Sequence, residues 1–270
     1  MHKYVMLLAP ILLCHVAMAG SPGVASQVKA LWQAQDYTAA HALLSPLVTK
    51  KTKDAELLAL LGQTEAALHN NEQAEALLEK ALKYDANNAD YQHWYATVSC
   101  NLAAGASMFS ALGYAKRCKK AYQAALELSP DNPRSYIALG SFLNQAPGIA
   151  GGDKAEALKL AQKLKQLDPL QGALLALNAS DLTDDAVFTA LLAEDELLSK
   201  RPESYLQRGV AFSRTDEHAK AISLFEQALT MPADDDAAVD AKAQALYQIG
   251  RSAVKGQTDH DKGISALQQF

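Results

Sequence analysis

Few residues in this chain have the types and spacing of a catalytic, metal-binding or phosphate-binding site. Five histidines follow residue 20: His41, His69, His93, His218 and His260. No two of them have metal-ligand spacing. The glycine-rich loop of residues 148–154 lacks the Gly-Lys-Ser/Thr ending of a phosphate loop, and the chain has no Gly-x-Ser-x-Gly nucleophile element. The sequence therefore predicts no catalytic residue, no metal site and no cofactor, and it gives no positive case for an enzyme.

Cys100 and Cys118 are the only cysteines after residue 20. In an oxidising compartment, two cysteines in one helical hairpin favour a disulfide. They lie almost symmetrically about the predicted hairpin tip, but Cys118 should face Ala96, which sets Cys100 about one turn out of register. Two outcomes stay open. The cysteines form a disulfide worth about 3 kcal/mol, or they are small side chains that fill helix contacts.

A secretory signal peptide is predicted over residues 1–19. Lys3 supplies the positive start, residues 5–16 form an apolar run too short to span a bilayer, and an Ala-x-Ala cleavage site ends at Ala19. The alternatives are an uncleaved anchor or a buried helix. No later apolar run reaches transmembrane length. We therefore expect an exported protein, without membrane insertion after signal cleavage, in a bacterial periplasm.

Composition favours helices and argues against nucleic acid as a partner. Hydrophobic residues make up 49% of the chain and aromatic residues only 7%, with leucine and alanine prominent. No stretch alternates apolar and polar residues as a half-buried strand would. The net charge is −5. A mildly acidic chain without a basic cluster is a poor nucleic-acid binder.

The elements that must position the polar residues are helical hairpins. Residues 118–140 fit one helix, a Ser-Pro-Asp-Asn-Pro turn and a second helix. Cys118, Tyr122 and Ala125 fall at i, i+4 and i+7, which places them on one helix face. Asn132 suits the cap of the second helix. The hairpin contains no obvious chemistry, so it is predicted to be a packing unit.

This packing pattern recurs along the chain. The small–bulky–small face of the second helix is repeated as Ala40/Leu44/Leu47, Ala74/Leu78/Ala81, Ala157/Ala161/Leu164, Ala221/Phe225/Ala228 and Gly263/Leu267/Phe270. A small residue of the first helix recurs as Val28, Gly62, Ala96, Gly140, Gly209 and Gly250. The first three of these positions are 34 residues apart, which is the spacing of a repeated helix-turn-helix unit.

The period and residue types resemble the tetratricopeptide repeat family. The resemblance implies an all-α fold, an α-solenoid of antiparallel helix pairs in a right-handed superhelix. Six to seven repeats are expected, over residues 24–53, 54–88, 89–132, 133–170, 171–201, 202–235 and 236–270. Pro46 should shorten a helix in the first repeat. The third repeat is longer than the standard unit, and the fifth is degenerate, with a short helix to about Ala179 and another over residues 184–199.

The resemblance also implies a concave face lined by the first helix of each repeat. The residues carried onto that face are Asp90, His93, Thr97, Asn101, Arg134, Ile137, Ser141, Asn144, Tyr247 and Arg251. This surface is polar and mixed in charge, which suits an extended peptide or protein segment. The basic clamp that binds a C-terminal carboxylate in some family members is not reproduced, since the matching places carry Ala59, Gln63, His93 and Thr97.

The sequence thus predicts a non-catalytic scaffold of the cell envelope that binds a protein or extended peptide. The alternative is an accessory or small-ligand-binding subunit of an envelope enzyme system. An enzyme would show a deep pocket that holds a residue with a strongly shifted pKa. Because Phe270 falls in the second helix of the last repeat, self-association through the C-terminal repeat is also expected.

Overall fold

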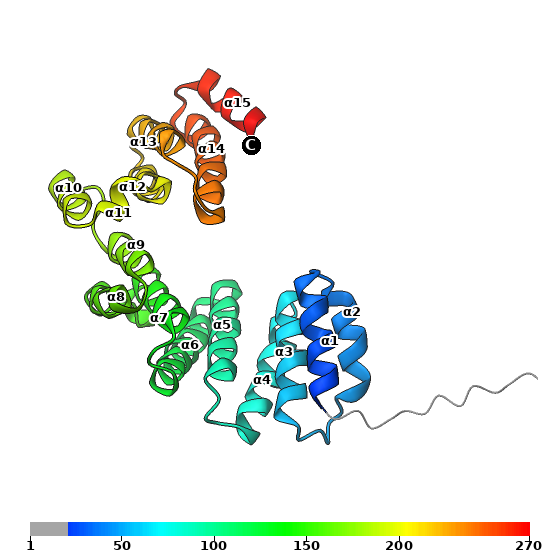
Figure 1. Ribbon diagram of the computed structural model, residues 1–270. Coiled ribbons are helices and arrows are strands. Elements are labelled where there is room, and N and C mark those ends of the chain that lie inside the picture. The colour runs from blue at the N-terminus through cyan, green and yellow to red at the C-terminus, as the bar shows by residue number, and fades with distance from the viewer. Residues whose placement is uncertain (1–20) are drawn as a thin grey trace, which may run out of the picture. The chain divides into compact units, whose positions relative to one another are not determined.

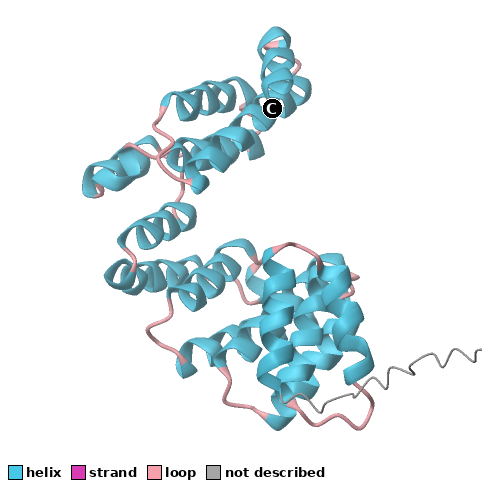
Figure 2. Ribbon diagram, turned by 45° about the vertical axis from the view of Figure 1, so that its right-hand side comes forward, coloured by secondary structure: helices cyan, strands magenta, loops and turns pink. Residues whose placement is uncertain are grey.

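The computed structural model describes residues 21–270, and the predicted leader lies outside them. Within this range the chain is all-α, as predicted, with no strand (Figure 2). The helices are α1 (Ser21–Gln33), α2 (Tyr37–Leu44), α3 (Ala55–Ala67), α4 (Asn71–Tyr84), α5 (Ala89–Gly105), α6 (Met108–Leu128), α7 (Pro133–Gln145), α8 (Lys154–Leu167), α9 (Pro169–Ala179), α10 (Asp185–Glu194), α11 (Glu196–Ser199), α12 (Pro202–Arg214), α13 (His218–Thr230), α14 (Asp236–Gly256) and α15 (His260–Gln269). Two 3-10 turns are η1 (Ser45–Leu47) and η2 (Gly148–Ala150).

The helices form two compact units. Unit 1 ends at Ala86 and contains the pairs α1–α2 and α3–α4, and unit 2 begins at Asn87 and contains α5–α15. In unit 2, contacts between α6 and α7, α7 and α9, α9 and α12, and α12 and α14 join consecutive pairs. Figure 1 shows α5, α7, α9, α12 and α14 along one side of unit 2, with α6, α8, α10 and α13 along the other.

Glycines of the first helices let the paired helices approach closely. A Cβ added at Gly62 would lie 2.8 Å from Cγ of Leu78, and one added at Gly209 would lie 2.5 Å from Cε1 of Phe225. Leu78 and Phe225 are fully buried. In these two pairs the bulky residue of the second helix fills the space that the glycine leaves, which is the packing that the repeated pattern predicts. At Gly140 the space is filled by Leu175 of α9, the first helix of the next pair.

The first repeat departs from the pattern at a proline. Helix α2 ends at Leu44, and η1 follows it, because Pro46 has no N–H with which to continue the helix. The shortening was predicted. The prediction that Leu47 belongs to the packing face is wrong, because the chain has already left the helix and Leu47 is 42% exposed.

Carboxylate and amide caps begin several helices. The side-chain oxygens of Asn132 and Asp153 accept hydrogen bonds from backbone N–H groups at the starts of α7 and α8, at 3.1 and 3.0 Å. Asp168 stands alone between α8 and α9. Its N–H donates to Leu164 O at 2.7 Å, and its carboxylate accepts from Gln171 N at 3.0 Å. A single residue therefore ends one helix and begins the next.

The degenerate fifth repeat differs from its prediction in one respect. The helix expected over residues 184–199 is divided at Asp195 into α10 and α11. The Asp195 carboxylate accepts from Leu197 N at 3.1 Å and lies 2.8 Å from Lys165 Nζ of α8. At the break, the buried Asp195 carboxylate both caps α11 and forms an ion pair. The periodicity of the sequence alone could not indicate this break.

An ionic clamp joins consecutive repeats near the start of α12. Arg201 donates to both oxygens of Glu203 and, through Nη1, to Asp235 Oδ2 at 2.7 Å. Asp235 stands 34 residues after Arg201 and also caps α14 by accepting from Ala238 N at 2.8 Å. The hydrogen bond from Arg201 lowers the pKa of Asp235 to about 2. The clamp therefore ties the starts of α12 and α14, one repeat apart.

Candidate functional site

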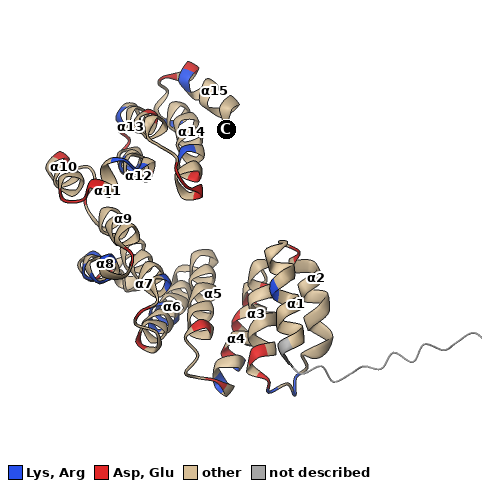
Figure 3. Ribbon diagram, viewed as in Figure 1, with Lys and Arg blue, Asp and Glu red and all other residues tan. Residues whose placement is uncertain are grey.

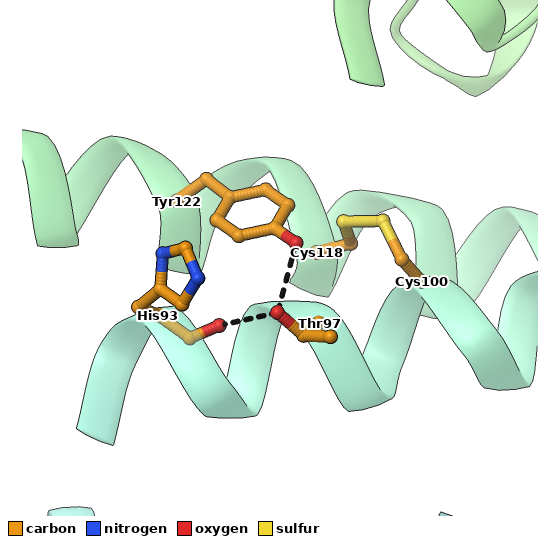
Figure 4. Close-up of a disulfide and its surroundings, with 5 residues drawn as sticks. All are labelled: His93, Thr97, Cys100, Cys118 and Tyr122. Atoms are coloured by element: carbon orange, nitrogen blue, oxygen red, sulfur yellow. Dashed lines mark hydrogen bonds between the residues drawn. A yellow bond between two sulfur atoms is a disulfide. The ribbon is translucent and has the colours of Figure 1, made fainter. Parts of the chain in front are cut away.

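Helices α5 and α6 form a long hairpin that is cross-linked near its middle. Cys100 of α5 and Cys118 of α6 are joined by a disulfide, with Cα atoms 5.3 Å apart (Figure 4). Cys118 is fully buried. The register that the sequence suggested would have set the two cysteines about one turn apart, and the structure brings them opposite each other.

His93 lies two turns before Cys100 in the same hairpin, and the structure buries it. Its side chain is 8% exposed and meets Tyr122 edge-on, with ring centroids 5.4 Å apart (Figure 4). This corrects the expectation that His93 faces an open groove. The reason is Tyr122, whose large ring takes the bulky position of α6 and packs against His93.

Some of the polar atoms around His93 have hydrogen-bond partners, and one of its own ring nitrogens has none. Thr97 Oγ1 donates its hydrogen to the carbonyl oxygen of His93 at 3.0 Å. Because a hydroxyl has a single hydrogen to donate, Thr97 Oγ1 acts as the acceptor in its 3.0 Å contact with the Tyr122 hydroxyl, which donates. His93 Nδ1 is buried without a hydrogen-bond partner. Burial, helped by the charge of Arg134 and opposed by Asp90, lowers the pKa of His93 to about 4. The imidazole is therefore neutral at physiological pH.

The neighbours of His93 that were predicted on the concave face are more open. Asp90, Asn101 and Arg134 are exposed, and the Arg134 guanidinium lies 5.5 Å from the ring centroid of Trp94. Ile137 is half-buried against the core of unit 2. These side chains form a solvated edge, and neither of the two large cavities described below is lined by them.

Ser141 and Asn144 open into a groove formed by α7, α9 and α12. We call it the polar groove. Its volume is about 820 Å³, and polar side chains form most of its lining. Besides Ser141 and Asn144, its polar residues are Gln145, Lys154, Asn178, Ser180, Asp181, Thr183, Gln207, Arg214 and Thr215. The groove thus collects side chains from three first helices of consecutive pairs.

Charge in the polar groove is mixed. Lys154 and Arg214 are exposed cations, and Asp181 is an exposed anion. Thr183 donates to the Asp181 carboxylate from its hydroxyl at 2.7 Å and from its backbone N–H at 3.1 Å. These hydrogen bonds lower the pKa of Asp181. The groove therefore offers positive and negative groups together with uncharged donors and acceptors.

The last two predicted residues lie elsewhere. Tyr247 and Arg251 belong to α14, where both are exposed, and the Tyr247 ring lies 5.7 Å from that of Phe270. The ten predicted residues thus fall into three places: the α5–α6 hairpin with the start of α7, the polar groove, and the end of α14. Of the ten, Ser141 and Asn144 are the pair that shares a cavity.

Sequence reasoning missed the contribution of α9 and the loop after it. Asn178, Asp181 and Thr183 belong to the degenerate repeat, where the small–bulky–small pattern fails. The absence of the small–bulky–small pattern in this repeat could have indicated the site, because a helix face without that pattern leaves room for polar residues. Among residues 21–270, no cluster of three or more His, Cys, Asp or Glu could hold a metal ion, and no helix is long and apolar enough to cross a membrane.

Comparisons with known proteins agree with this architecture. Profiles of the tetratricopeptide repeat match residues 31–96, 104–132, 202–235 and 244–270, together more than half of the chain. No curated protein matches the chain in sequence.

Solved structures of repeat proteins share the fold. A tetratricopeptide repeat protein from Parabacteroides merdae is 13% identical, with a TM-score of 0.61 over 92% of this chain and 90% of its own. A thermophilic TPR protein of Thermus thermophilus is 14% identical, with a TM-score of 0.52 over 83% of this chain and 97% of its own. The repeat profiles and these shared folds together show that the chain belongs to the tetratricopeptide repeat family.

Proposed function

We propose that this protein is a non-catalytic scaffold of the cell envelope that binds an extended peptide or protein segment in the polar groove. Repeats of this family generally mediate protein interactions. The observation that carries the proposal is the groove itself, because it is formed by consecutive first helices and its lining is polar. Stacked repeats present such extended concave surfaces to their partners.

The chemistry of the lining suits a peptide backbone. Asn144, Asn178 and Gln207 each carry an amide that donates and accepts, as a peptide group does. An extended strand has unpaired N–H and C=O groups along both edges, so amides on neighbouring helices can bind it without reading its side chains. Lys154 and Asp181 then favour a segment that carries both signs of charge.

A second candidate is the accessory or small-ligand-binding role. The groove volume of about 820 Å³ lies within the range of about 300–1,000 Å³ that is usual for small-molecule pockets. A catalytic role has less support. The lowered pKa of His93 is the kind of shift found at active sites, but His93 lines neither the polar groove nor the second large cavity of unit 2. The proposed location in the envelope rests on the signal-like pattern of residues 1–19.

The groove is tested by removing two of its amides. Proteins that crosslink to the wild-type full chain in the periplasm are expected not to crosslink to Asn144→Ala/Asn178→Ala. The affinity for an isolated partner should fall about tenfold or more, because each lost hydrogen bond contributes about 1 kcal/mol. The matched control is Gln227→Ala/Gln244→Ala, which removes two exposed amides of α13 and α14. If the groove variant captures the same partners as the wild type, the polar groove is not the binding site.

Self-association through the C-terminal repeat stays a prediction. Large apolar side chains are exposed on α14 and α15: Val254 at 69%, Ile264 at 58%, Leu267 at 47% and Phe270 at 66%. We expect the sedimentation mass of the wild type to rise with concentration and that of Ile264→Asp to rise less, because a buried carboxylate opposes association. Gln268→Asp, at an exposed polar position of α15, should behave as the wild type. A constant monomer mass in all three proteins would contradict the prediction.

A further inference from the structure

A second large cavity of unit 2 is apolar. It lies between the end of α5, the first half of α6, the end of α7 and η2, and we call it the apolar cleft. Its volume is about 710 Å³. Its lining includes Ala104, Leu112, Ala115, Phe142, Pro147 and Ile149, and no charged residue. Small side chains of α5 and α6, among them Ala103, Ala104, Ala111 and Ala115, form much of its wall.

Unusually exposed apolar residues surround the apolar cleft. In the described part of the chain, the three most exposed large hydrophobic side chains are Phe109 at 90%, Ile149 at 80% and Met108 at 79%. Met108 and Ile149 line the cleft from α6 and η2, and Phe109 adjoins Met108. Exposed apolar patches on soluble proteins commonly mark binding sites. These residues therefore extend the apolar surface from the cleft to its rim.

The walls of the apolar cleft are held in place. Cys100 lines the cleft, and its disulfide to Cys118 fixes α5 against α6. Tyr122 also lines it, with its hydroxyl already bonded to Thr97. Lys119 Nζ donates to Gly151 O at 3.1 Å, which ties α6 to the residue after η2. The cavity is thus formed before a ligand arrives, which lowers the entropy lost on binding.

Helix α6, whose first half lines the apolar cleft, also carries basic residues (Figure 3). This helix carries Lys116, Arg117, Lys119 and Lys120 within five positions, a local cluster that the acidic total charge of the chain conceals. Lys119 lies four residues after Ala115 and three before Tyr122, which puts it on the lining face of the helix.

Lys119 and Lys116 can each meet an acidic group. Lys119 uses two of its three N–H donors, on Gly151 O and on Glu156 Oε2 at 3.1 Å, and one remains. Lys116 is exposed and lies one turn after Leu112, beside the lining face. Neither lysine is part of the cleft lining, so an acidic group would meet them at the edge of the cleft on α6, where Lys119 also pairs with Glu156.

We propose that the apolar cleft binds a free long-chain fatty acid, with its hydrocarbon chain in the cleft and its carboxylate at Lys119 and Lys116. An acyl chain suits this lining better than a peptide does. The N–H and C=O groups of a buried peptide would need partners along the whole cleft, whereas most of the lining is alanine, leucine, phenylalanine and other apolar side chains, with polar ones at Ser141, Gln145 and Tyr122. The acyl chain has no such groups, and its single polar end lies where the cations are. The apolar cleft adjoins the polar groove, since Ser141 and Gln145 line both, but Asn144 and Asn178 line the polar groove alone, so the two proposals can be tested apart.

The cleft is tested by filling it. Titration of the full chain with cis-parinaric acid should raise the fluorescence of this fatty acid with a micromolar midpoint, and palmitate should displace it. Ala111→Trp places an indole in the cleft and should weaken binding at least about tenfold. The matched control is Ala193→Trp, at an exposed position of α10, which should bind as the wild type does. Far-UV circular dichroism and the melting temperature show whether both variants fold.

The head-group contact is tested by charge. Lys116→Glu should weaken cis-parinarate binding about fivefold, the size expected for an exposed ion pair, while Lys159→Glu on α8 should not. Hexadecanol, which has the same chain without the acid, should compete more weakly than palmitate and equally well against both variants. Asn144→Ala/Asn178→Ala should bind the fatty acid normally, which separates this site from the polar groove.

Three results would overturn the proposal. In the first, neither cis-parinarate nor palmitate binds the wild type. In the second, Ala111→Trp binds as well as Ala193→Trp, which places the ligand elsewhere. In the third, phosphatidylglycerol vesicles or an apolar peptide bind in a way that depends on Ala111 while free palmitate does not, which assigns the cleft to a membrane surface or to a protein segment.

Discussion

Reduction of the Cys100–Cys118 disulfide is expected to lower the free energy of unfolding of unit 2 by about 3 kcal/mol. The bond closes a loop between residues 18 apart in sequence, and it limits the conformations of the unfolded chain. Urea unfolding with and without reductant measures the effect. A Trp32→Phe background leaves Trp94 of α5 as the single tryptophan, so fluorescence then reports unit 2 alone.

The control for this experiment is Cys100→Ala/Cys118→Ala in the same background. It should unfold at a lower urea concentration than the oxidised protein and show no further response to reductant. If the oxidised and reduced wild-type proteins unfold at the same midpoint, the disulfide does not stabilise the hairpin.

Acid is expected to destabilise unit 2 through His93. Burial holds the pKa of His93 at about 4, below the value of 6.5 for an unfolded chain. As the pH falls from 6.5 to 4, the unfolded chain therefore binds a proton that the folded chain does not, and stability is lost. The full shift corresponds to about 3 kcal/mol, and solvent screening of the exposed partners Asp90 and Arg134 reduces the expected loss to about 2 kcal/mol.

His93→Phe should remove most of this acid sensitivity. The phenyl ring can keep the edge-on contact with Tyr122, and it carries neither a proton to bind nor the buried Nδ1 that lacks a partner. Urea midpoints at pH 7.5 and 4.5, read from Trp94, give the comparison. His260→Gln removes an exposed histidine of α15 and should stay as acid-sensitive as the wild type. Equal acid sensitivity of His93→Phe and wild type would show that another group is responsible.

The helix pairs were predictable because their signals are local. Gly62 and Leu78 stand 16 residues apart, and the glycine and the bulky residue that covers it recur with similar spacing in other copies. Pro46 ends a helix by its own chemistry. The break at Asp195 was not predictable, because residues 184–199 have no proline or glycine, and Lys165, the ion-pair partner of Asp195, lies in another helix.

The sites were less predictable, because cavities depend on residues that are far apart in sequence. Ser141 and Asn144 were found from their helix face, but their neighbours Asn178 and Asp181 lie in the repeat where the pattern fails. His93 was placed on the right helix, yet its burial depends on Tyr122, 29 residues later. The apolar cleft has no signal in any single helix, since small residues of α5 and α6 become a cavity only when α7 and η2 close over them.

The Arg201–Asp235 clamp has a mechanical consequence. Because each repeat contacts mainly its neighbours, the clamp between the starts of α12 and α14 opposes the separation of these two consecutive repeats. Arg201 stays charged at every physiological pH, and Asp235 stays ionised down to about pH 2. Salt weakens an exposed ion pair, whereas acid in this range leaves it intact. The resistance of the α12–α14 contact to separation should therefore decrease as ionic strength rises. It should not change in the acid range that destabilises the α5–α6 hairpin.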